Sequence, residues 1–176
     1  MLLRRGWIKC GTIKFESEKN VGTTFMVQLP FLISADMKQA ESQEDDVSIE
    51  GMRILLAEDN ELNMEIAEFL LTNAGAEIIK ASNGKEAVEA FAKSGVGEIN
   101  VILMDIMMPV MDGLEATREI RTMNRSDASA VVIIAMTANA FTEDKTKALK
   151  SGMDDYLTKP LESEKLIRAL SRYKHN

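Results

Sequence analysis

From residue 51 onward, the chain alternates between short, continuous apolar runs and longer segments in which apolar residues recur every three or four positions. The continuous runs have the length and the β-branched content of strands. Because they lack polar alternation, they are typical of strands that are buried on both faces of a sheet. They predict five strands, at residues 52–57, 76–81, 99–105, 130–136 and 153–158.

The intervening segments have the periodicity of amphipathic helices. The positions that indicate the five helices are Leu62, Ile66, Phe69 and Leu70; Ala87, Val88 and Phe91; Leu114, Thr117, Ile120 and Arg121; Leu149; and Leu166, Ile167 and Leu170. Asn83 begins a capping-box pattern, and Thr142 and Ser163 are predicted N-terminal caps. Gly75 and Gly152 are predicted to end helices.

Strands that alternate with helices need crossover connections, which are right-handed and produce a parallel sheet covered on both faces. Of the two common doubly wound strand orders, a segment of about 125 residues favours the five-stranded one. The sequence therefore predicts an α/β fold, a flavodoxin-like doubly wound five-stranded parallel sheet of order 2-1-3-4-5 with five helices. Ligands of such sheets bind beyond the carboxyl ends of the strands, where the strand order reverses.

The first 50 residues have a different character. Alternating residues at 12–16 and 24–29, with a loop around Gly22 between them, predict a β-hairpin. Residues 34–50 hold six acidic residues, one basic residue and no aromatic residue, which is typical of a solvated linker. The predicted organisation is a hairpin fragment at 1–33, an acidic linker at 34–50 and the main domain at 51–176.

Composition excludes several classes of function. The net charge of -7 argues against general binding of nucleic acid, which needs a basic surface. Cys10 is the only cysteine and His175 the only histidine, which argues against a disulfide framework, a zinc finger, a Ser-His-Asp triad and a phospho-accepting histidine helix. Since no apolar run is long enough to span a bilayer, we expect a cytoplasmic chain without membrane contact.

Charged and polar side chains follow the predicted strands. Glu58 and Asp59 end the first strand and Asp105 ends the third, so the proposed strand order brings three carboxylates together. Two full charges about 4 Å apart repel by ~4 kcal/mol at an effective dielectric constant of ~20. Such a cluster therefore favours a cation, and hard oxygen ligands indicate Mg²⁺.

The residues around this cluster are those of phosphoryl transfer. Asp105 is the predicted nucleophile, because a carboxylate beside Mg²⁺ can attack phosphorus in line. Asp59 is expected to bind the metal directly and Glu58 through water. Lys159 and Thr137, at the ends of the fifth and fourth strands, would each contact a phosphoryl oxygen.

Four segments, ILLAEDNELN, ILMDIMMPVMDG, IIAMTA and GMDDYLTKP, resemble the receiver domain of two-component response regulators, and the resemblance covers residues 51–174. It implies that Asp105 accepts a phosphoryl group from phosphohistidine, that Glu58 and Asp59 are the acidic pair, and that Lys159 is the conserved-type lysine. Thr137 and Tyr156 would be the switch residues, whose movement on phosphorylation repacks the face of the fourth helix, fifth strand and fifth helix. That face would also allow a homodimer.

The resemblance implies two further details of the site. The backbone carbonyl of Met107 would complete the Mg²⁺ ligands, and a cis Lys159–Pro160 bond would aim the lysine. Glu58 departs from the commoner Asp-Asp pair, which we expect to change the reach of the side chain more than the metal affinity.

The segment CGTIKFESEKNVGTTFMVQLPF resembles the last two strands of the ATP-binding domain of sensor histidine kinases. A kinase end, a linker and a receiver in this order imply a hybrid histidine kinase. The expected partners are a histidine kinase, a histidine phosphotransfer domain or both. This chain by itself is expected neither to bind ATP nor to phosphorylate itself from it.

Other interpretations of the same residues remain open at this point. The chain could be a Mg²⁺-dependent phosphatase with Asp105 as nucleophile, although such enzymes place a second acid where this chain has Met107. It could be a flavodoxin-type cofactor binder, but the loop EDNELN is anionic rather than phosphate-cradling. Taken singly, Thr137 could be an ordinary strand-end hydroxyl and Tyr156 a core aromatic. These patterns leave the question of enzyme activity open, but they favour a self-catalysed phosphoacceptor over a dedicated enzyme.

Overall fold

The computed structural model describes residues 12–18, 22–28, 47–138 and 142–174, which belong to two units, Met1–Gln43 and Glu44–Asn176. In the second unit the apolar runs form one five-stranded parallel sheet of order β4-β3-β5-β6-β7. Counted along this unit, the order is 2-1-3-4-5, as predicted. The strands are β3 (Arg53–Ala57), β4 (Glu77–Ala81), β5 (Val101–Asp105), β6 (Val132–Thr137) and β7 (Asp155–Thr158).

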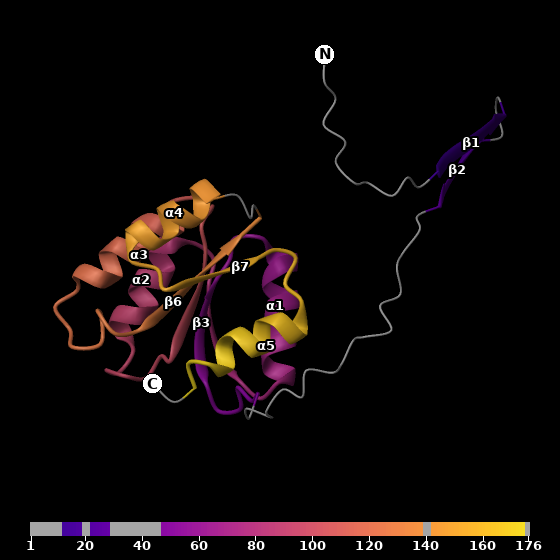
Figure 1. Cartoon of the computed structure of the whole chain (residues 1–176). Coiled ribbons are helices and arrows are strands. Elements are labelled where there is room, and N and C mark those ends of the chain that lie inside the picture. Colours follow the sequence, from indigo (N-terminus) through magenta and orange to yellow (C-terminus); the bar gives the residue numbers. More distant parts are fainter. Residues whose placement is uncertain (1–11, 19–21, 29–46, 139–141, 175–176) are drawn as a thin grey trace, which may run out of the picture. The chain divides into compact units, whose positions relative to one another are not determined.

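Five helices cover the two faces of this sheet (Figure 1): α2, α3 and α4 lie on one face, and α1 and α5 on the other. Both central strands, β5 and β6, are buried along their whole length, which explains why their sequences lack polar alternation. The helices are α1 (Glu61–Asn73), α2 (Gly84–Lys93), α3 (Gly113–Thr122), α4 (Thr142–Ser151) and α5 (Ser163–Ser171).

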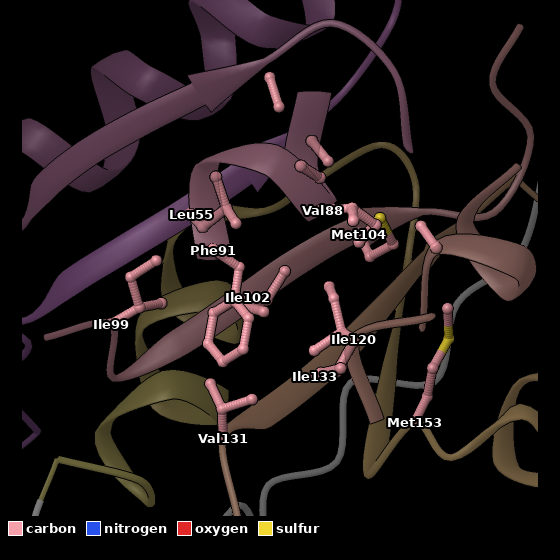
Figure 2. Close-up of a cluster of buried hydrophobic side chains, with 14 of the residues drawn as sticks. Leu55, Val88, Phe91, Ile99, Ile102, Met104, Ile120, Val131, Ile133 and Met153 are labelled. Carbon is pink, nitrogen blue, oxygen red and sulfur yellow. The ribbon is translucent and has the colours of Figure 1, made fainter. Parts of the chain in front are cut away.

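The core under α2 and α3 centres on Phe91, which is fully buried among aliphatic side chains from the sheet and from α3 (Figure 2). The guanidinium of Arg125 lies 4.2 Å from the centroid of its ring and also pairs with Asp127. A desolvated cation over an aromatic face adds attraction to the burial of the ring. This packing holds the α2–α3 layer against the sheet that carries the site.

Helix α1 is oriented differently from what its apolar pattern suggests. Three of the four positions that indicated the helix face solvent, with exposed fractions of 64% for Leu62, 46% for Ile66 and 67% for Phe69. The fourth, Leu70, is partly buried and packs against the core. Met64, Ala67 and Leu71 face the sheet instead. The helix was predicted correctly, but its apolar periodicity did not identify the side that packs, because α1 is apolar on two sides.

The predicted helix ends differ in outcome. The Asn83 side chain accepts a hydrogen bond from Glu86 N at 2.9 Å, which confirms the N-terminal cap of α2. Ser163 is not the cap of α5, because the helix already includes it and Glu162 occupies the cap position without a side-chain bond. The predicted cap role of the Thr142 side chain lies outside the described residues.

The first unit contains the predicted hairpin, formed by antiparallel strands β1 (Thr12–Glu18) and β2 (Gly22–Gln28). Phe15 and Phe25 pair across it with ring centroids 6.1 Å apart. In the second unit, Ile49 is fully buried although the sequence placed it in the linker, so the packed body begins before residue 51. Within the described parts of the chain, no helix has the length and apolar character needed to cross a bilayer.

Candidate functional site

The three predicted carboxylates lie together at the carboxyl edge of the sheet. Glu58 and Asp59 follow β3, and Asp105 is the last residue of the neighbouring strand β5. Each offers an oxygen within 4.8 Å of the others. Because the carboxyl ends of parallel strands lie at the same edge of a sheet, residues nearly 50 positions apart in the sequence come close together in space.

The Lys159 ammonium bridges two of these carboxylates. Its Nζ donates to Asp105 Oδ2 at 2.5 Å and also to Glu58 Oε2. Burial raises the pKa of the Asp105 carboxyl, and the hydrogen bond from Lys159 opposes this rise. Burial works against the charge of Lys159, but the hydrogen bonds to Asp105 and Glu58 outweigh it and raise the pKa of the lysine. The ammonium is therefore charged near neutral pH and offsets part of the carboxylate repulsion.

The carboxylates differ in exposure. Glu58 is 3% exposed and Asp105 is 7% exposed, whereas Asp59 is open to solvent. Asp105 Oδ1 accepts a hydrogen bond from Met107 N at 3.1 Å, so each oxygen of this carboxylate has a defined partner. Met107 is 82% exposed, while its backbone N–H lies next to the Asp105 carboxylate.

This donor set fits Mg²⁺. Hard oxygen ligands are present, the carboxylates converge, and the Lys159 ammonium does not balance all three negative charges. A pocket of about 440 Å³ opens over Asp59 and the loop that follows β5, lined in addition by Ile106, Met107, Met108, Pro109 and Asp112. The pocket leaves room for water and a phosphoryl group beside the carboxylates.

The remaining predicted residues lie at the same edge. Thr137 ends β6 and is buried, and its carbonyl accepts a hydrogen bond from Lys159 N at 2.8 Å. The Lys159–Pro160 bond is cis. Tyr156, on β7, is partly buried and packs against the core cluster beneath α3 and α4. The structure thus bonds the lysine to two of the carboxylates and places the threonine at the end of the neighbouring strand β6, while the tyrosine lies two residues before the end of β7.

A family model of the response regulator receiver domain matches residues 54–171. This chain belongs to that family. The receiver domain of sensor histidine kinase PA1611 from Pseudomonas aeruginosa PAO1, crystallised with a magnesium ion in its active-site cleft, is 39% identical with a TM-score of 0.65, over 72% of this chain and 99% of that one. The receiver domain of Ssk1 of Saccharomyces cerevisiae, crystallised with the phosphotransfer protein Ypd1, is 31% identical with a TM-score of 0.63, over 72% of this chain and 90% of that one.

Full-length relatives include hybrid kinases. Hybrid signal transduction histidine kinase I of Dictyostelium discoideum is 41% identical over 121 residues, which are 68% of this chain and 7% of that protein. The aerobic respiration control sensor protein ArcB of Escherichia coli K12 is 35% identical over 164 residues, which are 93% of this chain and 20% of ArcB. The chain spans a small part of these relatives and carries a receiver domain of the kind found in hybrid histidine kinases, a module of phosphorelay signalling.

Two features of the site were not found from the sequence. Asn63, on the first turn of α1, donates from Nδ2 to Glu58 Oε1 at 3.0 Å. The outward apolar side of α1, consisting of Leu62, Ile66 and Phe69 and called here the α1 stripe, borders the site. Ile66 lines a cavity of about 70 Å³ with Lys159 and its neighbours. The spacing of Asn63 from Glu58 within EDNELN was the available signal for the first feature.

Replacing Lys159 by Ala is expected to destabilise the metal-free domain by about 2–3 kcal/mol, because two buried carboxylates lose their common cation. Saturating Mg²⁺ should recover most of this loss and should bind the variant more tightly than the wild type. Urea unfolding with EDTA and with Mg²⁺ measures both effects. Lys165→Ala, which removes an exposed lysine from its pair with Glu162, is the control and should change little. Equal losses with and without Mg²⁺ would contradict the electrostatic explanation.

Proposed function

We propose that this receiver accepts a phosphoryl group from a phosphohistidine onto Asp105, with Mg²⁺ bound by Asp59, Glu58, Asp105 and the Met107 carbonyl. The observation that carries this proposal is the position of Asp105: a nearly buried carboxylate at the end of the central strand, bonded to Lys159 and clustered with two acids. The Mg²⁺-bound receiver of PA1611 supports the metal part of the proposal.

The reaction forms a bond between an Asp105 oxygen and phosphorus while the bond from phosphorus to the histidine nitrogen breaks. The electron pair of that bond stays on the imidazole, which takes up a proton from solvent. Lys159 and Thr137 stabilise the charge of the phosphoryl oxygens, and bound Mg²⁺ supplies further neutralisation of that charge. Where a phosphatase would carry its second acid, this chain has an exposed Met107, which favours the phosphoacceptor over the phosphatase.

Phosphorylation adds roughly 1 to 2 negative charges and three acceptor oxygens at Asp105. In our proposal Thr137 moves to hydrogen-bond one of these oxygens, and Tyr156 turns into the space that it leaves. The surface formed by α4, β7 and α5 then repacks, and it can also serve a homodimer.

In this proposal the partner that docks on the α1 stripe carries the histidine: a histidine kinase that donates the phosphoryl group, or a histidine phosphotransfer domain that exchanges it with the receiver. Three apolar side chains at spacings of four and three residues form a continuous side of the helix, and Leu62 stands on its first turn, next to the acidic pair. Exposed apolar patches of this kind mark contacts with other proteins. The co-crystal of Ssk1 with Ypd1 supports a phosphotransfer protein as partner.

Replacing Leu62 and Phe69 together by Ser is expected to slow phosphotransfer from phosphorylated Ypd1, used as a surrogate donor, by at least about tenfold, while labelling by acetyl phosphate stays unchanged. The small donor needs no docking surface, so only the protein donor senses the loss. Leu149→Ser, an exposed apolar residue on α4, is the matched control and should preserve both rates. Equal slowing with both donors would place the defect in the site rather than in docking.

We also propose that the hairpin is the end of a kinase ATP-binding domain and that the parent protein is a hybrid histidine kinase acting in the cytoplasm. The match to ArcB covers 93% of this chain and therefore extends upstream of the receiver. In such a protein the receiver passes its phosphoryl group to a phosphotransfer domain rather than driving DNA binding.

The site assignment is tested by incubating the chain with acetyl phosphate and Mg²⁺ and then reducing the acyl phosphate with borohydride. The reduction converts the labelled aspartate to homoserine, which mass spectrometry of the peptides locates. We expect a single modified residue, Asp105, and no label when EDTA replaces Mg²⁺. Label on Asp59 or Asp112, or label that persists in EDTA, would refute the proposed site.

A further inference from the structure

The two oxygens of Glu58 have different partners. Oε2 accepts from the Lys159 ammonium, on the side of Asp105. Oε1 accepts from Asn63 Nδ2 at 3.0 Å, on the side of α1, and Asn60 N lies 3.4 Å from the same oxygen. With its side chain almost fully buried, Glu58 is thus held at both ends of its carboxylate.

The start of α1 fixes where Asn63 stands. Asn60 caps the helix, and its Oδ1 accepts a hydrogen bond from Asn63 N at 3.0 Å. The Asn63 side chain leaves this ordered first turn and reaches back to Glu58. A carboxylate only accepts hydrogen bonds, so the amide nitrogen of Asn63 must face it.

The chemistry of this donor differs from that of Lys159. The Asn63 amide is neutral, so it orients Glu58 without reducing the negative charge that attracts a divalent cation. Glutamate has one more rotatable bond than aspartate, and without a tether the carboxylate could leave the pocket, at a gain in side-chain entropy. Tethering Oε1 to α1 leaves Oε2 as the oxygen directed at the site.

We infer that Asn63 is a positioning residue for the metal site, which selects the oxygen of Glu58 that faces the cation. This inference rests on the proposed function, because it takes Mg²⁺ as the ligand of Glu58, Asp59 and Asp105. Removing a partner that orients a metal ligand typically weakens metal binding by about 10–100-fold. Because Glu58 is expected to bind the metal through water, we expect the loss of Mg²⁺ affinity to lie at the lower end of this range.

The test is a Mg²⁺ titration of the full chain, followed in ¹⁵N NMR spectra. Asn63→Ala is expected to raise the Mg²⁺ dissociation constant by about tenfold. Asn73→Ala, which removes the same side chain from the exposed last turn of α1, should stay within about twofold of the wild type. In Glu58→Asp the side chain is one methylene shorter and is expected to lose the hydrogen bond to Asn63, so adding Asn63→Ala to that variant should have almost no further effect.

A structural role for Asn63 would give a different pattern. Loss of helix stability would weaken Mg²⁺ binding equally in the wild-type and Glu58→Asp backgrounds, and it would lower the urea midpoint of the metal-free chain by itself. That pattern, or an unchanged affinity in Asn63→Ala, overturns the inference. Asp59→Asn separates the two proposals: if the wild type binds Mg²⁺ and this variant does not, the metal site stands whatever Asn63 does. If the wild type itself does not bind Mg²⁺, both the metal site and the positioning role of Asn63 are refuted.

Discussion

Asp105→Asn is expected to abolish labelling by acetyl phosphate completely, while the fold persists. The amide keeps the size of the carboxylate and can still accept hydrogen bonds, but it is not a nucleophile toward phosphorus. Burial raises the pKa of Asp105, and the hydrogen bonds from Lys159 and from Met107 N only partly oppose this rise, so exchanging the carboxylate for a neutral amide removes little net stabilisation. We therefore expect the free energy of unfolding to stay within about 1 kcal/mol of the wild type.

Asp112→Asn is the control for this variant. Asp112 lines the same pocket and caps α3, accepting a hydrogen bond from Glu115 N at 2.7 Å, and Asn caps helices as well as Asp does. It should retain full labelling. Loss of label in Asp112→Asn with retention in Asp105→Asn would move the phosphoacceptor from the end of β5 to the start of α3.

Gly113→Ala is expected to destabilise the domain by about 3 kcal/mol or more and to slow phosphorylation as well. A methyl group at Gly113 would lie 2.1 Å from the Asp105 carbonyl oxygen and 2.9 Å from Met104 Cγ. Adding atoms to a packed core costs about 1–3 kcal/mol where the neighbouring side chains can shift. A backbone carbonyl can shift less than a side chain, so the cost at Gly113 is expected to be at the upper end of this range or above it. Because that carbonyl belongs to Asp105, the proposed phosphoacceptor, relief of the clash must displace Asp105 itself.

Gly95→Ala provides the comparison. Its added methyl group would meet only the flexible end of Glu98, at 3.2 Å from Oε2. The expected change in unfolding free energy is within about 0.5 kcal/mol. Urea unfolding and the rate of acetyl phosphate labelling, measured on both variants, check the prediction. If Gly113→Ala labels at the wild-type rate, the close packing of α3 on β5 does not control the position of Asp105.

The fold followed from the sequence because its signals are local. Each buried strand appears as an apolar run, and the alternation with helices leaves few possible topologies. The same reasoning failed on α1, where Leu62, Ile66 and Phe69 indicated the helix but not the side that packs. Periodicity reports that a side of a helix is apolar, and it does not distinguish a side that faces the sheet from one that faces a partner.

The amino-acid sequence by itself determined the strand order and the presence of three acids, a lysine and a threonine at strand ends, since parallel strands place their carboxyl ends at one edge. Only the tertiary structure decided how these groups pair. It buried Glu58 and exposed Asp59, and it bonded Lys159 to Glu58 across 101 residues. It also assigned Asn63 to the second oxygen of Glu58. Hydrogen bonds act over about 3 Å, and distances that short depend on the packing of whole helices against the sheet.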